Sequence, residues 1–314
     1  MTDELLVVAL GGNALLKRGE PLDASIQRAN IATAAASLAI AARDHGLVVT
    51  HGNGPQVGLL ALQNEAYPDV ARYPLDVLGA ETEGMIGYVL DQHLANHLPQ
   101  GHVATLLTQV VVDGNDPALL APSKPIGPVY DEEQARRLAA LRGWTMVPDG
   151  AYWRRAVPSP RPLEIVELPV IRLLTLHGVT VVCSGGGGIP VVRDGEGLRG
   201  IEAVIDKDAT SSLLARGLDA TQLILLTDVS GVATGWGTEH EQWLRTIAPD
   251  ALRSLTFAGG SMQPKIDAVC DFVEATGRRA SIGSLDDLAG ILDGQAGTAV
   301  FPGAHTSFYR RPAA

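Results

Sequence analysis

The sequence predicts an α/β protein: a three-layer α/β/α sandwich around a mostly parallel open sheet, with an inserted, protruding lid subdomain. Three observations lead to this prediction. Short, continuously apolar segments alternate with longer amphipathic ones, several apolar segments end in glycine clusters, and one internal section is rich in proline. Continuous apolar strands are typical of parallel sheets that helices cover on both faces.

The first half of the chain begins with a run of apolar residues and continues with an alanine-rich stretch, which favours a strand and then a helix. Glycine follows each of the first two strands and also closes the first helix. The expected elements, in the order strand, helix, strand, helix, helix and strand, cover residues 5–10, 23–45, 47–50, 56–65, 75–97 and 103–112.

The second half repeats the alternation of helix and strand. Ser284-Leu285-Asp286-Asp287 fits a capping box that opens a short helix. The other expected elements, alternately helix and strand and ending in a strand, cover residues 163–177, 179–183, 208–216, 223–226, 263–276, 279–282 and 299–301.

The section between residues 113 and 169 differs from the rest, because it contains nine of the 19 prolines. A structureless loop of this length is uncommon inside a compact domain. We therefore expect an inserted subdomain of turns and hairpins that serves as a lid.

Composition narrows the class of protein. With 24 basic and 35 acidic residues the net charge is −11, which disfavours a nucleic acid or an anionic membrane as partner. Two cysteines cannot form a disulfide framework, no apolar run is long enough to span a membrane, and the first residues lack a basic leader. These features predict a soluble protein of the cytoplasm.

Three glycine clusters follow expected strands: Gly11-Gly12-Asn13, Gly52-Asn53-Gly54 and the run at 185–188. Glycine allows backbone N–H groups to converge on a ligand, and ligands of open α/β sheets lie at the carboxyl ends of strands. The clusters therefore predict an anion site. The sequence has no P-loop, no dinucleotide fingerprint, no nucleophile elbow and no zinc-type spacing, and we assign no residue as a metal ligand.

Three of the four lysines lie in unusual surroundings. Lys124 stands among prolines, Lys207 lies between two aspartates at a strand-to-helix junction, and Lys265 falls in the first turn of an expected helix. A lysine at a helix N-terminus is unfavourable unless an anion is also present. Lysines that converge on one anion suit phosphoryl transfer, where catalysis is largely positioning and electrostatics.

Eight segments together resemble the amino-acid-kinase fold family, and within it the carbamate kinases. The segments containing Lys124 and Lys207 are specific to that branch. In chain order the matching segments cover residues 8–15, 50–58, 81–88, 124–128, 157–160, 185–191, 202–208 and 260–265.

The resemblance implies reversible phosphoryl transfer between ATP and carbamate, giving ADP and carbamoyl phosphate and often running toward ATP. It implies Mg²⁺ carried by the nucleotide and a homodimer. It also implies an N-terminal lobe for carbamate over 1–200, with the lid at about 113–169, and a nucleotide-binding lobe over 201–314.

The resemblance also implies roles for individual residues. Lys124 would reach the transferred group from the lid, Lys207 would stabilise the transition state, Asp208 would orient the lysines, and Lys265 would hold nucleotide phosphates. The residues expected to donate N–H groups to carbamate and the phosphoryl group are Gly11, Gly12, Asn13, Gly52 and Asn53. The nucleotide-binding residues expected are Lys207, Asp228, Trp236, Met262 and Lys265.

Two other functions remain open from the sequence. One is a related kinase that acts on another small carboxylate, and the other is a catalytically silent sensor of nucleotide or carbamoyl phosphate. The Lys-Pro-Ile-Gly-Pro segment at 124–128 disfavours the first, and the presence of all three lysines disfavours the second.

Overall fold

The computed structural model describes residues 4–17, 19–67, 69–257 and 262–309. Within these ranges, ten strands form one central sheet in the order β13-β14-β16-β15-β12-β1-β2-β9-β3, with β17 paired to β14. The strands are β1 (Leu5–Leu10), β2 (Gly46–His51), β3 (His102–Thr105), β9 (Val179–Val182), β12 (Gln222–Thr227), β13 (Ala233–Thr234), β14 (Gln242–Ile247), β15 (Arg279–Ser284), β16 (Thr298–Val300) and β17 (Ser307–Tyr309).

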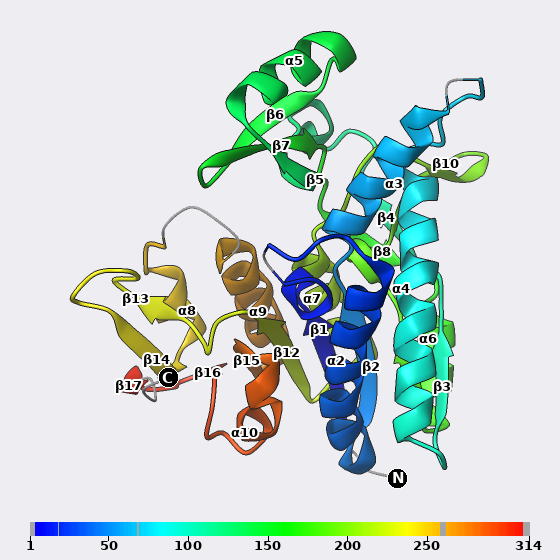
Figure 1. Ribbon diagram of the computed structural model, residues 1–314. Helices are drawn as coiled ribbons and strands as arrows, with labels where there is room; N and C mark the ends of the chain where they lie inside the picture. Colours follow the sequence, from blue (N-terminus) through cyan, green and yellow to red (C-terminus); the bar gives the residue numbers. More distant parts are fainter. Residues whose placement is uncertain (1–3, 18, 68, 258–261, 310–314) are drawn as a thin grey trace.

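Six neighbouring strands, from β15 through β12, β1, β2 and β9 to β3, run parallel. Leu10 at the end of β1 stands opposite both Leu226 of β12 and His51 of β2. Their carboxyl ends therefore meet at one edge of the sheet, which is the upper edge in Figure 1. We call this the carboxyl edge.

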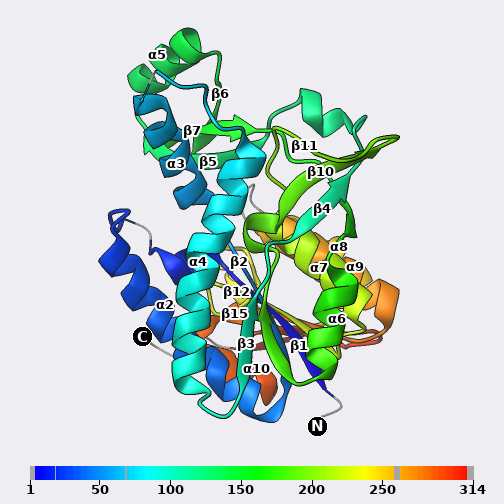
Figure 2. The same ribbon diagram turned by 90° about the vertical axis from the view of Figure 1, so that its right-hand side faces the viewer.

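Helices cover both faces of the sheet, as the two sets of alternating side chains on β1 require. Leu6, Val8 and Leu10 point into a core shared with α2 and α4, while Val7 and Ala9 point into a core shared with α7 and α9. Figures 1 and 2 show these two helical layers. The helices of the first layer are α1 (Gly12–Leu15), α2 (Ala24–Asp44), α4 (Leu75–His97) and α10 (Leu288–Leu292); those of the second are α6 (Leu168–Leu176), α7 (Lys207–Leu218), α8 (Pro249–Arg253) and α9 (Met262–Thr276).

Two smaller sheets lie beyond the carboxyl edge (Figure 2). One has the order β11-β10-β4-β8, and the other, β5-β7-β6, carries α5 and protrudes above α3 (Figure 1). The elements are α3 (Gly54–Ala66), β4 (Gln109–Val112), β8 (Pro162–Ile165), β10 (Ile189–Asp194), β11 (Gly197–Gly200), β5 (Lys124–Tyr130), α5 (Glu132–Arg142), β6 (Thr145–Asp149) and β7 (Tyr152–Val157). We call the part from β5 to β7 the lid.

The three-layer α/β fold with a mostly parallel sheet is confirmed, but two predicted elements are wrong in their extent. The strand expected over 103–112 is two strands, β3 and β4, that belong to different sheets. The helix expected over 163–177 begins only at Leu168, because Pro162–Ile165 forms β8 against β4. Apolar residues stand on both sides of each change, so periodicity does not mark where the chain leaves one sheet for another. No helix in the described ranges has the length and apolar character needed to cross a bilayer.

Candidate active site

The three glycine clusters meet at the carboxyl edge, because β1, β2 and β9 are neighbours in the sheet. A Cβ on Gly52 would lie 3.2 Å from the backbone nitrogen of Gly12, and a Cβ on Gly186 would lie 2.1 Å from the side chain of Asn53. Gly186 also has a positive φ of 68°, which favours glycine. The loops that follow the three strands thus touch at positions where a side chain would not fit.

Not all of these glycines offer an N–H group to a ligand. The N–H of Gly11 donates to the carbonyl of Leu226 at 2.9 Å, and that of Gly52 donates to the carbonyl of Leu10 at 3.2 Å. Both bonds extend the sheet, so Gly11 and Gly52 contribute close backbone approach instead of donors. Gly12 and Asn13 lie in the first turn of α1, where N–H groups have no acceptor within the helix.

Lys207, Asp208 and Lys265 form a buried cluster that we call the lysine–aspartate triad. Lys207 and Asp208 open α7, and Lys265 comes from the first turn of α9, which packs beside α7. Lys207 Nζ donates to Asp208 Oδ1 at 2.6 Å, and Lys265 Nζ donates to Asp208 Oδ2 at 2.8 Å. Asp208 is 4% exposed and Lys265 8%. One carboxylate therefore holds two ammonium groups at two helix N-termini.

The electrostatics of the triad follow from burial and this sharing. Burial raises the pKa of Asp208 when taken alone, but the charges of the two lysines outweigh it and hold that pKa well below its usual range. Burial lowers the pKa of Lys207, and the charge of Lys265 adds to that direction. The pKa of Lys265 is raised, because several carboxylates outweigh its burial. With both lysines protonated, the triad carries a net charge of +1, which an anionic ligand would neutralise.

Hydroxyl groups fix α7, and with it two members of the triad, against the glycine loops. Thr50 at the end of β2 and Ser211 on α7 share a hydrogen bond of 2.7 Å, and Thr210 Oγ1 donates to the carbonyl of Gly187 at 2.9 Å. The start of α7 is therefore tied both to the sheet and to the loop at 185–188.

Lys124, the first residue of β5, reaches from the lid to Asp206 and forms an ion pair with Asp206 Oδ2. Asp206 Oδ1 caps α7 by accepting the N–H groups of Asp208 at 2.9 Å and Ala209 at 3.3 Å. The lid lysine is thus placed directly beside the triad. The sequence assigned no role to Asp206, although an aspartate two residues before an expected helix is compatible with an N-cap, and the observed helix begins directly after it.

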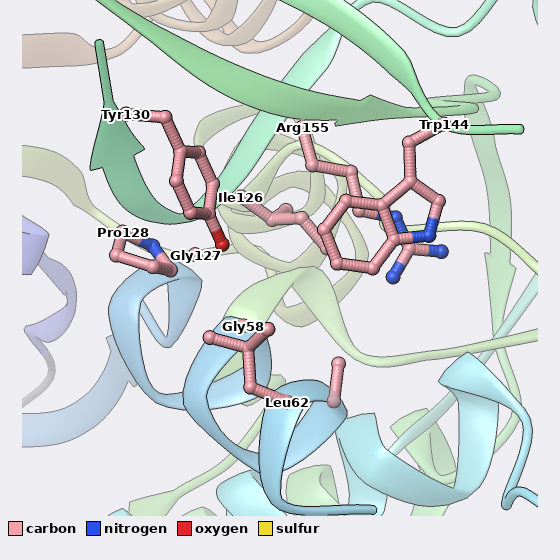
Figure 3. A pocket seen from close by; sticks show the side chains of 9 residues that line it. Gly58, Leu62, Ile126, Gly127, Pro128, Tyr130, Trp144 and Arg155 are labelled. Carbon is pink, nitrogen blue, oxygen red and sulfur yellow. The ribbon is translucent and has the colours of Figure 1, made fainter. Parts of the chain in front are cut away.

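The lid rests on α3 through two adjoining contacts. A Cβ on Gly58 would lie only 1.9 Å from Cα of Gly127, so the two backbones touch. Beside this contact is a small pocket that Figure 3 shows, with Tyr130, Trp144 and Arg155 pointing into it from the lid. The lid therefore has a defined seat on α3, and Gly127 in that seat follows Lys124 by three residues in β5.

The predicted nucleotide residues fall in different settings. Asp228 follows β12, and its charge helps to raise the pKa of Lys265, which places the two groups within electrostatic reach. Trp236, 55% exposed, lies between β13 and β14 with its ring 5.6 Å from that of Trp243. Met262 packs in part against the core beneath α9. Gly260 and Ser261, in the segment that precedes Lys265, lie outside the described residues.

The site combines glycine loops, two helix N-termini and three ammonium groups, and such an arrangement can bind and stabilise a transferring phosphoryl group. In the described part of the chain, no group of three or more His, Cys, Asp or Glu residues is placed to hold a metal ion.

Known proteins share this sequence and fold. The model of the amino acid kinase family matches residues 4–284. A carbamate kinase from Rhizobium meliloti is 52% identical over 299 residues, covering 94% of this chain and 92% of the relative. The chain belongs to the carbamate kinases of the amino acid kinase family. It is accordingly a phosphotransferase.

Solved structures agree with this assignment. The carbamate kinase of Giardia lamblia bound to citric acid superposes with a TM-score of 0.89 at 39% identity, covering 95% of this chain and 98% of that one. The same enzyme bound to AMP-PNP gives a TM-score of 0.86 at 40% identity, with the same coverage. The predicted family is thus confirmed.

Proposed function

We propose that this protein catalyses reversible phosphoryl transfer between ATP and carbamate, giving ADP and carbamoyl phosphate, and that it works mainly toward ATP. The lysine–aspartate triad carries the proposal, because it places a net positive charge at two helix N-termini beside the glycine loops. Charge on the phosphoryl oxygens of the transition state is what such a cluster stabilises.

In this proposal each charged residue has its own task. Lys207 stabilises the transferring phosphoryl group, Lys265 holds the nucleotide phosphates, and Asp208 orients both lysines. Lys124 approaches the phosphoryl group from the lid. The attacking oxygen of carbamate is already anionic, so the reaction needs no general base.

The remaining assignments complete the proposal. Gly12, Asn13 and Asn53 would donate to carbamate and the phosphoryl group, with Gly11 and Gly52 giving close approach. The first lobe, over 1–200, would hold carbamate, and the second, over 201–314, would hold the nucleotide near Asp228. Mg²⁺ would arrive as part of the MgATP or MgADP substrate. We expect a homodimer of the cytoplasm.

A kinase for another small carboxylate is the second candidate within the same fold. The ion pair between Lys124 and Asp206 favours carbamate, because a lid lysine held beside the triad suits a small substrate better than a larger one. A silent sensor is a further alternative, and the complete triad favours an active enzyme over it.

The test is ATP formation from carbamoyl phosphate, ADP and Mg²⁺, followed with a coupled assay. We expect ATP well above the rate without protein, and little from Lys207→Ala at the same concentration. Acetyl phosphate and N-acetylglutamyl phosphate, offered in place of carbamoyl phosphate, test the second candidate. Folded wild-type protein that makes no ATP from carbamoyl phosphate would overturn the proposal.

A further inference from the structure

The segment from Glu81 to Tyr88 resembles the carbamate kinases, yet nothing above gives it a role. It lies on α4, and two consecutive polar residues in it, Thr82 and Glu83, are 0% and 1% exposed. Buried polar side chains without a function are costly unless their hydrogen bonds are satisfied. Their partners therefore indicate what the pair does.

Thr82 holds the loop after β2. Asn53 Nδ2 donates to Thr82 Oγ1 at 2.8 Å, and Thr82 Oγ1 in turn donates to the carbonyl of Gly79 at 2.8 Å. Because Thr82 has its own acceptor within α4, its hydroxyl is oriented to accept from Asn53. This bond fixes the side chain against which Gly186 packs.

Glu83 holds the loop after β9. Glu83 Oε1 accepts the N–H of Gly185 at 2.7 Å, and Glu83 Oε2 accepts the N–H of Thr108 at 3.2 Å. Thr108 Oγ1 accepts the N–H of Ser184 at 2.9 Å, which ties the same loop a second time. A Cβ on Gly185 would lie 2.9 Å from Cγ of Glu83 and 2.4 Å from the ring of His51, so the loop is clamped between α4 and the end of β2.

We propose that Thr82 and Glu83 are positioning residues, which set the glycine loop after β2 and the loop at 185–188 to each other through one turn of α4. The inference rests on the proposed function, since that function assigns Gly52 and Asn53 to carbamate and the phosphoryl group, and the loop at 185–188 packs against Asn53 through Gly186. The pair touches neither substrate. Instead, it holds Asn53 and the backbone at 185–188 in a fixed position relative to each other. A displacement of about 1 Å in such a site can lower the rate on the order of 100-fold.

The experiment compares Thr82→Val and Glu83→Gln with Thr82→Ser and Glu81→Gln. Valine keeps the shape of threonine without its hydroxyl, and glutamine turns one acceptor of Glu83 into a donor that faces an N–H group. Thr82→Ser restores the hydroxyl. Glu81 is exposed on the same helix, so Glu81→Gln is the matched control for the same substitution outside the buried pair.

We expect Thr82→Val and Glu83→Gln to lower kcat/KM for carbamoyl phosphate about 10-fold or more, while KM for MgADP stays within about twofold, because a lost hydrogen bond displaces only the loop after β2 and the loop at 185–188. Thr82→Ser and Glu81→Gln should match wild type. Equal changes in the kinetic constants for both substrates, or no change for either substrate, would overturn the inference while leaving the proposed function intact.

Amide hydrogen exchange supplies a readout that needs no activity. In the two disruptive variants, peptides covering residues 184–188 should exchange faster, whereas those of β1 should not. Wild-type protein inactive with carbamoyl phosphate would refute the proposed function alone. Unchanged exchange at 184–188 in both variants would refute the positioning role, even if neither variant could be assayed for activity.

Discussion

Replacing Asp208 with asparagine should destabilise the free protein severely, because it leaves two buried ammonium groups without their shared carboxylate. Asp208 is 4% exposed and contacts Lys207 and Lys265 at 2.6 and 2.8 Å. Removing one partner of a buried ion pair costs about 3–5 kcal/mol. A lysine can escape this cost by losing its proton, which from an ordinary pKa of about 10.4 costs about 4.6 kcal/mol at pH 7. Both routes lead to a loss of about 3–5 kcal/mol at pH 7.

The pH dependence of this loss distinguishes the effect of unpaired lysine charges from the effect of a simple packing defect. In Asp208→Asn the pKa of Lys207 should fall further below its unfolded value, so the native state binds fewer protons than the unfolded chain. Stability then rises with pH, and the deficit against wild type should shrink by up to about 1.4 kcal/mol per unit between pH 7 and pH 9.

The assay is urea unfolding without ligand at both pH values. Asp267→Asn is the matched control, since Asp267 pairs with Arg253 on the exposed side of α9 and its loss should cost at most about 1 kcal/mol. The triple variant with Lys207→Met and Lys265→Met should recover most of the stability, because apolar replacement of a whole buried ion cluster is often neutral. A deficit within about 1 kcal/mol of zero at pH 7, or one that does not shrink by pH 9, would refute the reasoning.

Three further predictions follow from the same structure. Lys207→Ala should lower kcat roughly 100-fold or more, measured as ATP formation, and a kcat within a few-fold of wild type would contradict its role in the transition state. Gly58→Ala places a methyl group 1.9 Å from Cα of Gly127, so the lid should lose its seat and become sensitive to limited proteolysis within residues 124–157; an unchanged digestion pattern would argue against that seat. Burial raises the pKa of Glu83 to about 8, so the native state holds its proton more tightly than the unfolded chain. Between pH 6.5 and 8 wild type should therefore lose up to about 1.4 kcal/mol of stability per unit, a slope that urea unfolding should not find in Glu83→Gln.

Much of the fold could be predicted because the local sequence pattern is sufficient to indicate many single helices and strands. The strand expected over 5–10 matches β1, and the helix expected over 75–97 matches α4. The glycine clusters also indicated the carboxyl edge correctly, because parallel strands bring their ends together. One failure was the single strand over 103–112, whose apolar residues are equally suited to two sheets, and the helix over 163–177 failed in the same way at β8.

The chemistry of the site could be predicted only in part, because hydrogen-bond partners depend on contacts across the fold. Lys207 and Lys265 could be found from their local surroundings. The pair of Lys124 and Asp206 could not, because the two residues are 82 positions apart in the chain and only the fold of the lid brings them together. The N–H groups of Gly11 and Gly52 looked available in the sequence, yet pairing between strands uses both.

The free protein holds its three site lysines on two carboxylates, and this balance has a mechanistic consequence. Asp206 keeps Lys124 beside α7, and Asp208 keeps Lys207 and Lys265 together, so three positive charges face two negative ones at two helix N-termini. The excess is unfavourable until a phosphate arrives, because helix N-termini favour anions over cations. Under the proposed function, a bound phosphate with two negative charges would change the net charge of this arrangement from +1 to −1. Part of the binding energy would thus come from neutralising the excess positive charge of the free protein. After release of the product, the two aspartates would hold the lysines in place for the next turnover.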